Sequence, residues 1–167
     1  MIIERKWAMP NKWTFKIKPI KELLDEEING DFIDPFAGMY SPCNVTNDLN
    51  PEMPTTYHMD AIDFLKSFES ESVDGVLYDP PYSQRQVKEC YDGIQGDMKW
   101  DGRMTFWSKS KDEVARIIKP GGKAICFGWN SMGLGAKRGF RIERILIVPH
   151  GGSRNDTICT VEIKEAP

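Results

Sequence analysis

The residues of this chain that are best placed to do chemistry form the tetrapeptide Asp79-Pro80-Pro81-Tyr82. It follows the apolar, β-branched run 73–78, which predicts a buried strand of an α/β sheet. Two consecutive prolines have no backbone N–H to donate and a fixed φ, so the strand should end there in a stiff turn. A carboxylate, two carbonyls and an aromatic ring then stand at the carboxyl end of a strand, where open α/β sheets bind ligands. The alternative is an ordinary strand-to-loop turn, because Asp-Pro is common in turns.

An exocyclic amine on a nucleobase is a group that such a turn suits. Asp79 can accept a hydrogen bond from one N–H and the Pro80 carbonyl from the other, which favours a pyramidal nitrogen with its lone pair aimed outwards. Fixed acceptors also stabilise the positive charge that the nitrogen gains as a methyl group arrives. The ring of Tyr82 offers a face on which an extruded base can stack.

Two segments ahead of this turn are expected to help form the same site. Residues 18–28 predict an amphipathic helix that begins near Pro19. Residues 31–38 predict a strand that runs into a tight turn, in which Gly38 lets the backbone approach a ligand closely. Only nine positions separate Gly38 from Asn47, so we expect the first helix of the fold to be abbreviated or missing.

Further acidic residues follow at the ends of short β-prone runs. Asp48 would end a very short second strand, where an acidic residue commonly binds ribose hydroxyls, although Asn-Asp is equally typical of a turn. Asp60 is a good N-cap for the amphipathic segment 61–68.

The second half of the chain predicts a loop, a helix and three strands. Residues 83–104 are polar and lack a periodic apolar pattern, so we expect a lid that also touches nucleic acid, or else a plain surface loop. Residues 105–119 predict a helix that ends at the Lys-Pro-Gly-Gly stretch 119–122. Segments 123–128, 141–149 and 155–164 are expected to be strands, the last two of them forming a terminal hairpin.

Composition predicts a single domain over residues 1–167. The sequence has neither a secretory signal nor a run long enough to span a membrane. Four scattered cysteines and two distant histidines lack metal-ligand spacing, which indicates reduced thiols, no metal site and a cytoplasmic protein.

Charge is divided unevenly along the chain. Residues 31–80 hold one Lys or Arg against ten Asp or Glu, a net charge of −9, whereas residues 81–150 hold thirteen against seven, a net charge of +6. An acidic half suits a cationic cofactor and a basic half suits phosphates. The alternative is that both are merely solvated faces.

Three motifs resemble those of a known enzyme family. Asp79-Pro80-Pro81-Tyr82 resembles the catalytic signature of the amino-methyltransferases, and Asp in first place resembles the adenine-N6 DNA enzymes. Asp34-Pro35-Phe36-Ala37-Gly38 resembles their first motif, and Lys18-Pro19-x-x-Leu-Leu their tenth. Tyr40 stands where many members have a second glycine. The chain is therefore similar to the small adenine-N6 DNA methyltransferases of phages and mobile elements.

The resemblance implies a Rossmann-like, mostly parallel sheet with a C-terminal antiparallel hairpin, and S-adenosylmethionine as the cofactor. It also implies that the single domain over residues 1–167 is catalytic and has no separate target-recognition domain. The residues that it implies around the cofactor are Lys18, Asp34, Pro35, Phe36, Ala37, Gly38, Asp48, Asp60 and Ala61. Those expected to contact the substrate are Tyr82, Arg85, Lys88, Trp129, Asn130, Lys137 and Arg138.

The implied function is methyl transfer to N6 of an adenine flipped out of duplex DNA, by a protein that could act as a homodimer. Two alternatives stay open at this point. One is a guanine-N2 methyltransferase acting on structured RNA, which would use a similar turn. The other is a non-catalytic nucleic-acid-binding subunit that needs a partner.

Overall fold

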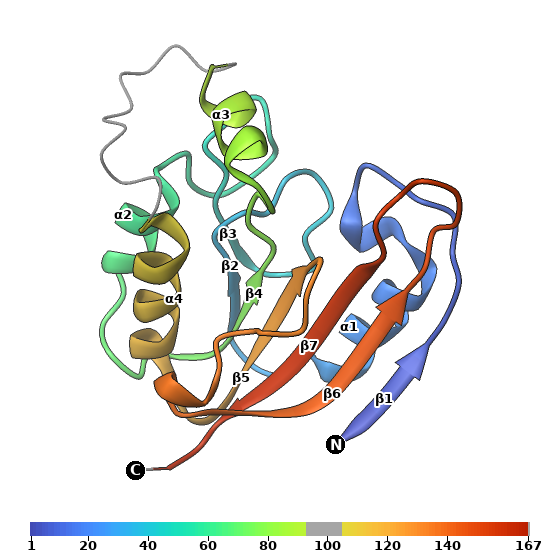
Figure 1. Ribbon diagram of the computed structural model, residues 1–167. Coiled ribbons are helices and arrows are strands. Elements are labelled where there is room, and N and C mark those ends of the chain that lie inside the picture. The colour runs from blue at the N-terminus through green and yellow to red at the C-terminus, as the bar shows by residue number, and fades with distance from the viewer. Residues whose placement is uncertain (93–104, 167) are drawn as a thin grey trace.

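The structure is a computed structural model that describes residues 1–92 and 105–166 (Figure 1). Within them, seven strands form one sheet in the order β1-β6-β7-β5-β4-β2-β3. Antiparallel pairing joins β7 to its neighbours β5 and β6, and all other pairs are parallel. The strands are β1 (Ile2–Arg5), β2 (Phe32–Asp34), β3 (Val45–Thr46), β4 (Val73–Tyr78), β5 (Ile118–Gly128), β6 (Phe140–Val148) and β7 (Thr157–Lys164). The predicted mostly parallel sheet with a terminal antiparallel hairpin is confirmed.

Helices cover both faces of this sheet (Figure 1). On one face α1 (Lys18–Glu27) packs its buried leucines against Leu77, Ile125 and Phe127. On the other face α2 (Ala61–Lys66) and α4 (Phe106–Ile117) pack against Val76, Tyr78 and neighbouring residues. Successive residues of a strand point to opposite faces, so β4 and β5 each supply side chains to both cores. This double burial explains the continuous apolar runs in their sequences.

The connection from β2 to β3 contains no helix, as the short spacing predicts. The expected β-prone run after β3 is reduced to a single bridge, in which Tyr57 pairs with Asn47. Space is therefore left open above the carboxyl ends of β2, β3 and β4.

The polar segment after the catalytic turn differs from the predicted loop. Residues Gln84–Asp92 form helix α3, while the rest of the predicted lid, residues 93–104, lies outside the described residues. Ion pairs at i,i+4 spacing, Arg85 with Glu89 and Lys88 with Asp92, support the helix. The sequence did not predict this helix because its apolar pattern is weak. Val87 is its one strongly buried residue among those whose burial is described.

Two other boundaries differ from expectation. Strand β5 begins at Ile118 and includes the Pro-Gly-Gly stretch, which bulges between two registers of the pairing with β4. Strand β1 was not predicted, and it pairs with β6 at the far edge of the sheet. The Arg144 guanidinium joins the two, since it lies 2.6 Å from a carboxylate oxygen of Glu4.

The segment that follows β1 stays attached to the C-terminal hairpin. The Lys6 N–H donates to the Ile147 carbonyl over 3.0 Å, and the Ala8 N–H to that of Pro149 over 3.2 Å. A ring nitrogen of His150 is hydrogen-bonded to the Ala8 carbonyl at 2.9 Å. The described helices include none that is both long enough and apolar enough to cross a membrane.

Candidate active site

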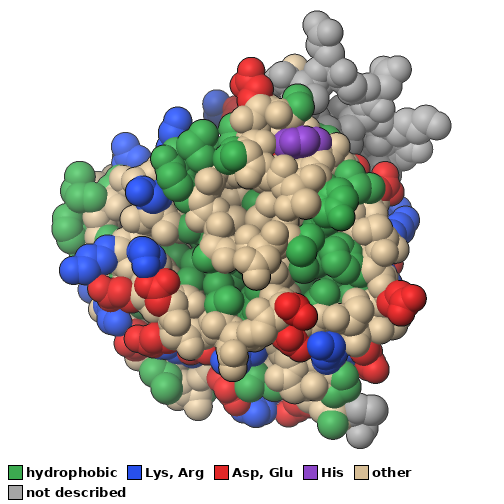
Figure 2. Space-filling model, turned by 180° about the vertical axis from the view of Figure 1, so that it is seen from behind, with side chains coloured by type: hydrophobic (Ala, Val, Ile, Leu, Met, Phe, Trp, Pro, Cys, Tyr) green, Lys and Arg blue, Asp and Glu red, His purple; other side chains and the backbone are tan. Residues whose placement is uncertain are grey.

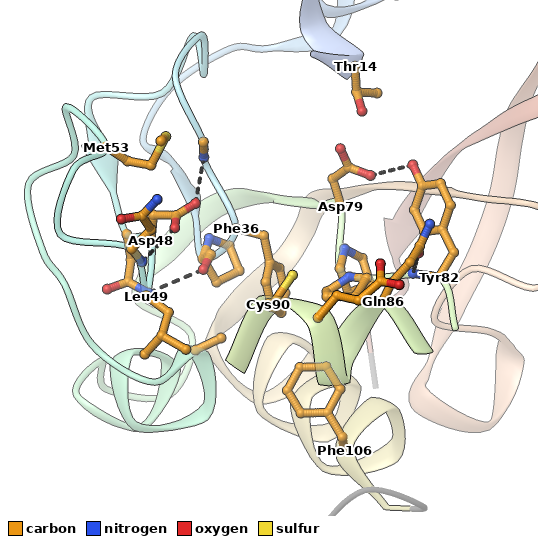
Figure 3. Close-up of a pocket in the computed structure, with 18 of the residues that line it drawn as sticks. Thr14, Phe36, Asp48, Leu49, Met53, Asp79, Tyr82, Gln86, Cys90 and Phe106 are labelled. Carbon is orange, nitrogen blue, oxygen red and sulfur yellow. Dashed lines mark hydrogen bonds between the residues drawn. The ribbon is translucent and has the colours of Figure 1, made fainter. Parts of the chain in front are cut away.

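A cavity of about 670 Å³ opens above the carboxyl ends of β2, β3 and β4 (Figure 3). Residues from seven separate segments line it, including the N-terminal segment, the turn after β2 and helix α3. Its lining residues include Trp13, Thr14, Pro35, Phe36, Gly38, Asp48, Leu49, Met53, Met59, Ala61, Asp79, Pro80, Pro81, Tyr82, Gln86, Glu89, Cys90 and Phe106. The predicted catalytic turn and most of the predicted cofactor residues thus meet at one place.

Asp79 is oriented by the hydroxyl group of Tyr82, which donates a hydrogen bond of 2.5 Å to Oδ1 of Asp79 (Figure 3). The Thr14 side chain faces the same carboxylate (Figure 3). Burial raises the pKa of Asp79, whereas the hydroxyls of Tyr82 and Thr14 favour the ionised form and oppose the rise. The result is a carboxylate of defined orientation that faces the cavity.

The backbone of the catalytic turn is also fixed. The Tyr82 N–H donates to Oε1 of Gln86 over 2.6 Å, so α3 braces the turn. The indole N–H of Trp107, on α4, donates to the Pro81 carbonyl over 2.9 Å. The Tyr82 ring meets that of Trp129 edge-on, with centroids 5.6 Å apart.

Asp34 organises the turn after β2 from inside the protein. It is fully buried; its Oδ1 accepts the Phe36 N–H at 2.9 Å and its Oδ2 accepts the Ser41 hydroxyl at 2.6 Å. Burial, together with repulsion from the carboxylates of Asp79 and Asp48, raises its pKa to about 7. The residue therefore shapes the cavity wall and adds to its negative potential.

Asp48 and Asn47 brace the same wall. Asp48 lies on the cavity and accepts the Gly38 N–H at 3.0 Å. Asn47, fully buried, donates from its amide to the carbonyls of Pro35 and Met59 and accepts the Met59 N–H. Gly38 has a φ of +56°, a conformation that suits glycine, and a Cβ there would lie 3.3 Å from the Trp13 ring.

Asp60 caps α2, as its position predicts. Its Oδ1 accepts the N–H groups of Ile62 and Asp63. Its neighbours Met59 and Ala61 line the cavity. A contact of Asp60 with a cofactor remains a prediction.

A second cavity, of about 120 Å³, lies on the other side of Tyr82. Pro80 and Tyr82 line both cavities, and Trp129 and Asn130, which are predicted to contact substrate, line this one. The buried Glu162 carboxylate anchors the loop that carries them, because it accepts the Leu134 N–H at 2.7 Å and the Gly135 N–H at 3.0 Å.

Several predicted contacts lie away from both cavities. The side chain of Lys18 is 87% exposed and lies 4.0 Å from Glu22 on α1. Arg85 and Lys88 are exposed on α3 and paired with its acidic residues, and Arg138 is paired with Asp112 at 2.7 Å. Lys137 is exposed in the short helix η3 (Ala136–Arg138). The fold places none of these five residues, which were predicted to contact the cofactor or nucleic acid, in the lining of either cavity.

Sequence reasoning missed the residues that come from distant segments. Thr14, in the short helix η1 (Thr14–Lys16), and Trp107 reach the catalytic turn from the N-terminal segment and from α4. Neither belongs to a local motif. One signal in the sequence could have identified Thr14. It stands next to Trp13, just before the stretch that resembles the tenth motif.

Comparison with solved structures identifies the fold. A putative S-adenosylmethionine-dependent methyltransferase from Listeria monocytogenes is similar over 87% of this chain and 97% of its own, with a TM-score of 0.55 and 12% identity. A 1,6-didemethyltoxoflavin-N1-methyltransferase from Burkholderia thailandensis, solved with bound S-adenosylhomocysteine, is similar over 89% of this chain and 76% of its own, with a TM-score of 0.53 and 11% identity. This is the fold of S-adenosylmethionine-dependent methyltransferases.

Two further similarities cover larger proteins. TrmN from Thermus thermophilus gives a TM-score of 0.57 at 16% identity over 88% of this chain and 47% of its own. In sequence, the Type II methyltransferase M.BamHI from Bacillus amyloliquefaciens is 31% identical over 78 residues, 45% of this chain. The chain spans 18% of that enzyme's length and about half of TrmN's. No protein-family model matches the sequence.

Proposed function

We propose that this chain transfers the methyl group of S-adenosylmethionine to an exocyclic amine of a base in DNA, with N6 of adenine as the acceptor. The observation that carries the proposal is the braced Asp79 carboxylate, which faces a cavity shared with the turns after β2 and β3. The partial sequence similarity to a Type II methyltransferase supports the class of reaction and the choice of DNA.

The residues around the cavity fit this cofactor. Its volume of about 670 Å³ lies in the range of small-molecule sites. Phe36, Leu49 and Met53 supply apolar walls for an adenine ring, and Asp48 stands at the end of β3, where ribose hydroxyls bind in Rossmann-like sites. Burial raises the pKa of Asp34, and repulsion from the Asp79 and Asp48 carboxylates adds to the rise. The negative potential of these carboxylates favours a cationic sulfonium group.

When bound, the cofactor supplies an electrophilic methyl group. Asp79 and the Pro80 carbonyl then orient the acceptor amine by taking its two N–H hydrogen bonds, so that the nitrogen lone pair faces the methyl carbon. The same two oxygens stabilise the positive charge that develops on nitrogen as the bond from sulfur to the methyl group breaks, and the methylated amine then releases its extra proton to water. Thr14 and Tyr82 keep the carboxylate of Asp79 in place throughout, and we assign to Asp79 orientation and stabilisation rather than full proton abstraction.

In this proposal the target base leaves the duplex stack to reach Asp79. The small cavity beside Tyr82, lined by Trp129 and Asn130, adjoins the place where the base would enter. A homodimer would span more of the duplex than one chain, and sedimentation of the protein with its DNA would reveal its stoichiometry.

The test is incubation with methyl-labelled S-adenosylmethionine and separate duplex DNA and RNA pools, followed by nucleoside mass spectrometry. Label in N6-methyldeoxyadenosine is expected. Label in the amine of deoxycytidine would keep the chemistry and change the base, and label in guanosine from RNA would replace the substrate. No label in any pool would contradict the proposal for the chain acting alone.

Asp79→Ala and Asp79→Asn provide the matched variants for this experiment. Each removes one charged acceptor from the amine, and we expect turnover to fall by about 10²–10³-fold or more. Affinity for the cofactor, measured by calorimetry, should stay within a few-fold of wild type. Variants that retain most activity would refute the role assigned to Asp79.

A further inference from the structure

An exposed cluster of two lysines and two aromatic rings lies beside the larger cavity. The Lys12 ammonium lies 4.8 Å from the centroid of the Trp13 ring, and the Lys16 ammonium lies 4.7 Å from that of Tyr40. The two rings meet edge-on at 5.8 Å. We call these four residues the Lys12–Tyr40 cluster. It joins the N-terminal segment to the turn after β2.

The cluster is continuous with the candidate active site. Trp13 and Thr14 both line the cavity, and Thr14 faces the Asp79 carboxylate across it (Figure 3). Lys12 and Lys16 each stand two residues from Thr14, so their Cα atoms lie within about 7.6 Å of its Cα, at 3.8 Å per residue. The cluster therefore lies beside the segment of the cavity wall that faces Asp79.

The two ammonium groups are available to an anion. Among the described residues, the ion pairs of the N-terminal lysines involve Lys6, Lys18 and Lys21 and leave out Lys12 and Lys16. Both side chains are exposed, and Tyr40 is 43% exposed. An aromatic face holds a cation in place without consuming its N–H donors. Figure 2 shows basic and hydrophobic side chains interspersed on the side of the molecule away from the grey residues.

Charge changes sign between the cavity and its rim. Asp48, Asp79 and Glu89 line the cavity, whereas the Lys12–Tyr40 cluster presents positive charge outside it. A ligand that matches both has a part that enters the acidic cavity and a polyanionic part that stays outside. A nucleotide within a strand has this distribution, with a base that carries no phosphate and a phosphodiester on each side.

We propose that the Lys12–Tyr40 cluster binds the phosphodiester backbone of the DNA strand next to the flipped base. The inference rests on the proposed function for the identity of the nucleic acid, and it assigns a role to Tyr40, the residue that departs from the family pattern. It also differs from the sequence-based expectation, which placed the basic nucleic-acid contacts on Arg85, Lys88, Lys137 and Arg138. Of these, Arg85 and Lys88 are paired with carboxylates on α3. Lysine recognises phosphate as a point charge, and aromatic rings add stacking to unpaired bases.

The test measures binding of a fluorescent mixed-sequence DNA duplex by Lys12→Gln/Lys16→Gln at several salt concentrations. Each phosphate contact contributes about 0.7–0.9 to the slope of log affinity against log salt, so the slope should fall by about 1.4–1.8. The loss of affinity should therefore be about 7- to 12-fold larger near 50 mM salt than near 200 mM. Lys6→Gln/Lys21→Gln removes two lysine charges that are paired with carboxylates and should behave as wild type.

A second pair of variants tests the aromatic support of Lys16. Tyr40→Phe keeps the ring beneath the ammonium and should bind DNA as wild type does. Tyr40→Leu removes the ring and should weaken binding by roughly two- to fivefold, the contribution of an exposed cation–π pair. Equal behaviour of the two variants would contradict the role given to the ring.

Three outcomes would overturn the proposal. The first is an unchanged salt slope in Lys12→Gln/Lys16→Gln. The second is an equal loss of S-adenosylhomocysteine affinity in calorimetry, which would assign the lysines to the cofactor carboxylate. The third is lysine-dependent binding of an RNA hairpin in preference to DNA. Because none of these measurements needs turnover, they separate failure of this inference from failure of the proposed methyl transfer.

Discussion

Asp34→Asn is expected to stabilise the protein by an amount that grows with pH. The wild-type carboxyl is fully buried, and burial together with the Asp79 and Asp48 carboxylates raises its pKa from 3.8 to about 7. An amide at this position keeps the oxygen that accepts the Phe36 N–H, and the Ser41 hydroxyl can accept from the new NH₂ group. The substitution therefore removes the ionisation and retains the packing.

The sign and size of the pH effect on the unfolding free energy follow from proton binding by Asp34. The folded protein keeps the Asp34 proton to a higher pH than the unfolded chain does, so the unfolding free energy falls as the pH rises from about 4 to about 7, and then levels off. A difference of about 3 pKa units corresponds to about 4 kcal/mol in total. About 3 kcal/mol of it falls between pH 5 and pH 8. The variant escapes this loss because an amide does not ionise.

The assay is urea unfolding of wild type and Asp34→Asn at pH 5 and pH 8 without cofactor. The difference between the two proteins cancels the pH dependence of the groups that do not interact with Asp34. Asp31→Asn, which removes an exposed carboxylate from the same segment, is the matched control. If Asp34→Asn gains the same unfolding free energy at both pH values, the reasoning from buried ionisation is refuted.

Three other perturbations act on contacts described above. Affinity for S-adenosylmethionine should rise from pH 6 to pH 8 in wild type, because a cation favours ionised Asp34. The affinity of Asp34→Asn should stay level over the same range. Parallel pH curves for the two proteins in calorimetry would contradict this linkage. Tyr82→Phe loses a hydrogen bond to a charged acceptor, worth about 1.5–3 kcal/mol, so kcat/KM should fall roughly 10- to 150-fold. The acidic limb of its pH–rate profile should also move to higher pH, since that bond lowers the pKa of Asp79, and an unmoved limb would argue against the bond. Glu162→Ala leaves the buried N–H groups of Leu134 and Gly135 without their acceptor and should lower the unfolding free energy by about 2–5 kcal/mol. Glu162→Gln should cost less, and equal losses on urea unfolding would show that the charge, not the acceptor, matters.

Signals from consecutive residues were sufficient to predict the elements that carry the catalytic turn. The apolar run of β4, the prolines after it and the small-residue turn after β2 are properties of consecutive residues. The same holds for helices α1 and α4 and for the terminal hairpin, whose patterns identified them within a few residues. The carboxyl ends of parallel neighbours lie at one edge, so the meeting of Asp34, Asp48 and Asp79 could also be predicted.

Tertiary partners were beyond the reach of such signals. Strand β1 ends in charged residues and exists because it pairs with β6, whose residues follow it by more than a hundred positions. Thr14 contributes to the site through the path of the chain, not through a motif. Helix α3 buries so few apolar residues that its sequence resembles a loop, and its ion pairs become visible only once the helix is assumed.

The attachment of the N-terminal segment to the C-terminal hairpin makes the site dependent on the order of synthesis. Residues 1–16 leave the ribosome well before the strand and loop that hold them, β6 and the residues up to His150. Contacts of such wide sequence separation form late and slowly. A nascent chain can thus complete β2, β4 and the Asp79 turn while Thr14 has no anchor, and we expect the carboxylate to acquire its final orientation only after the hairpin closes.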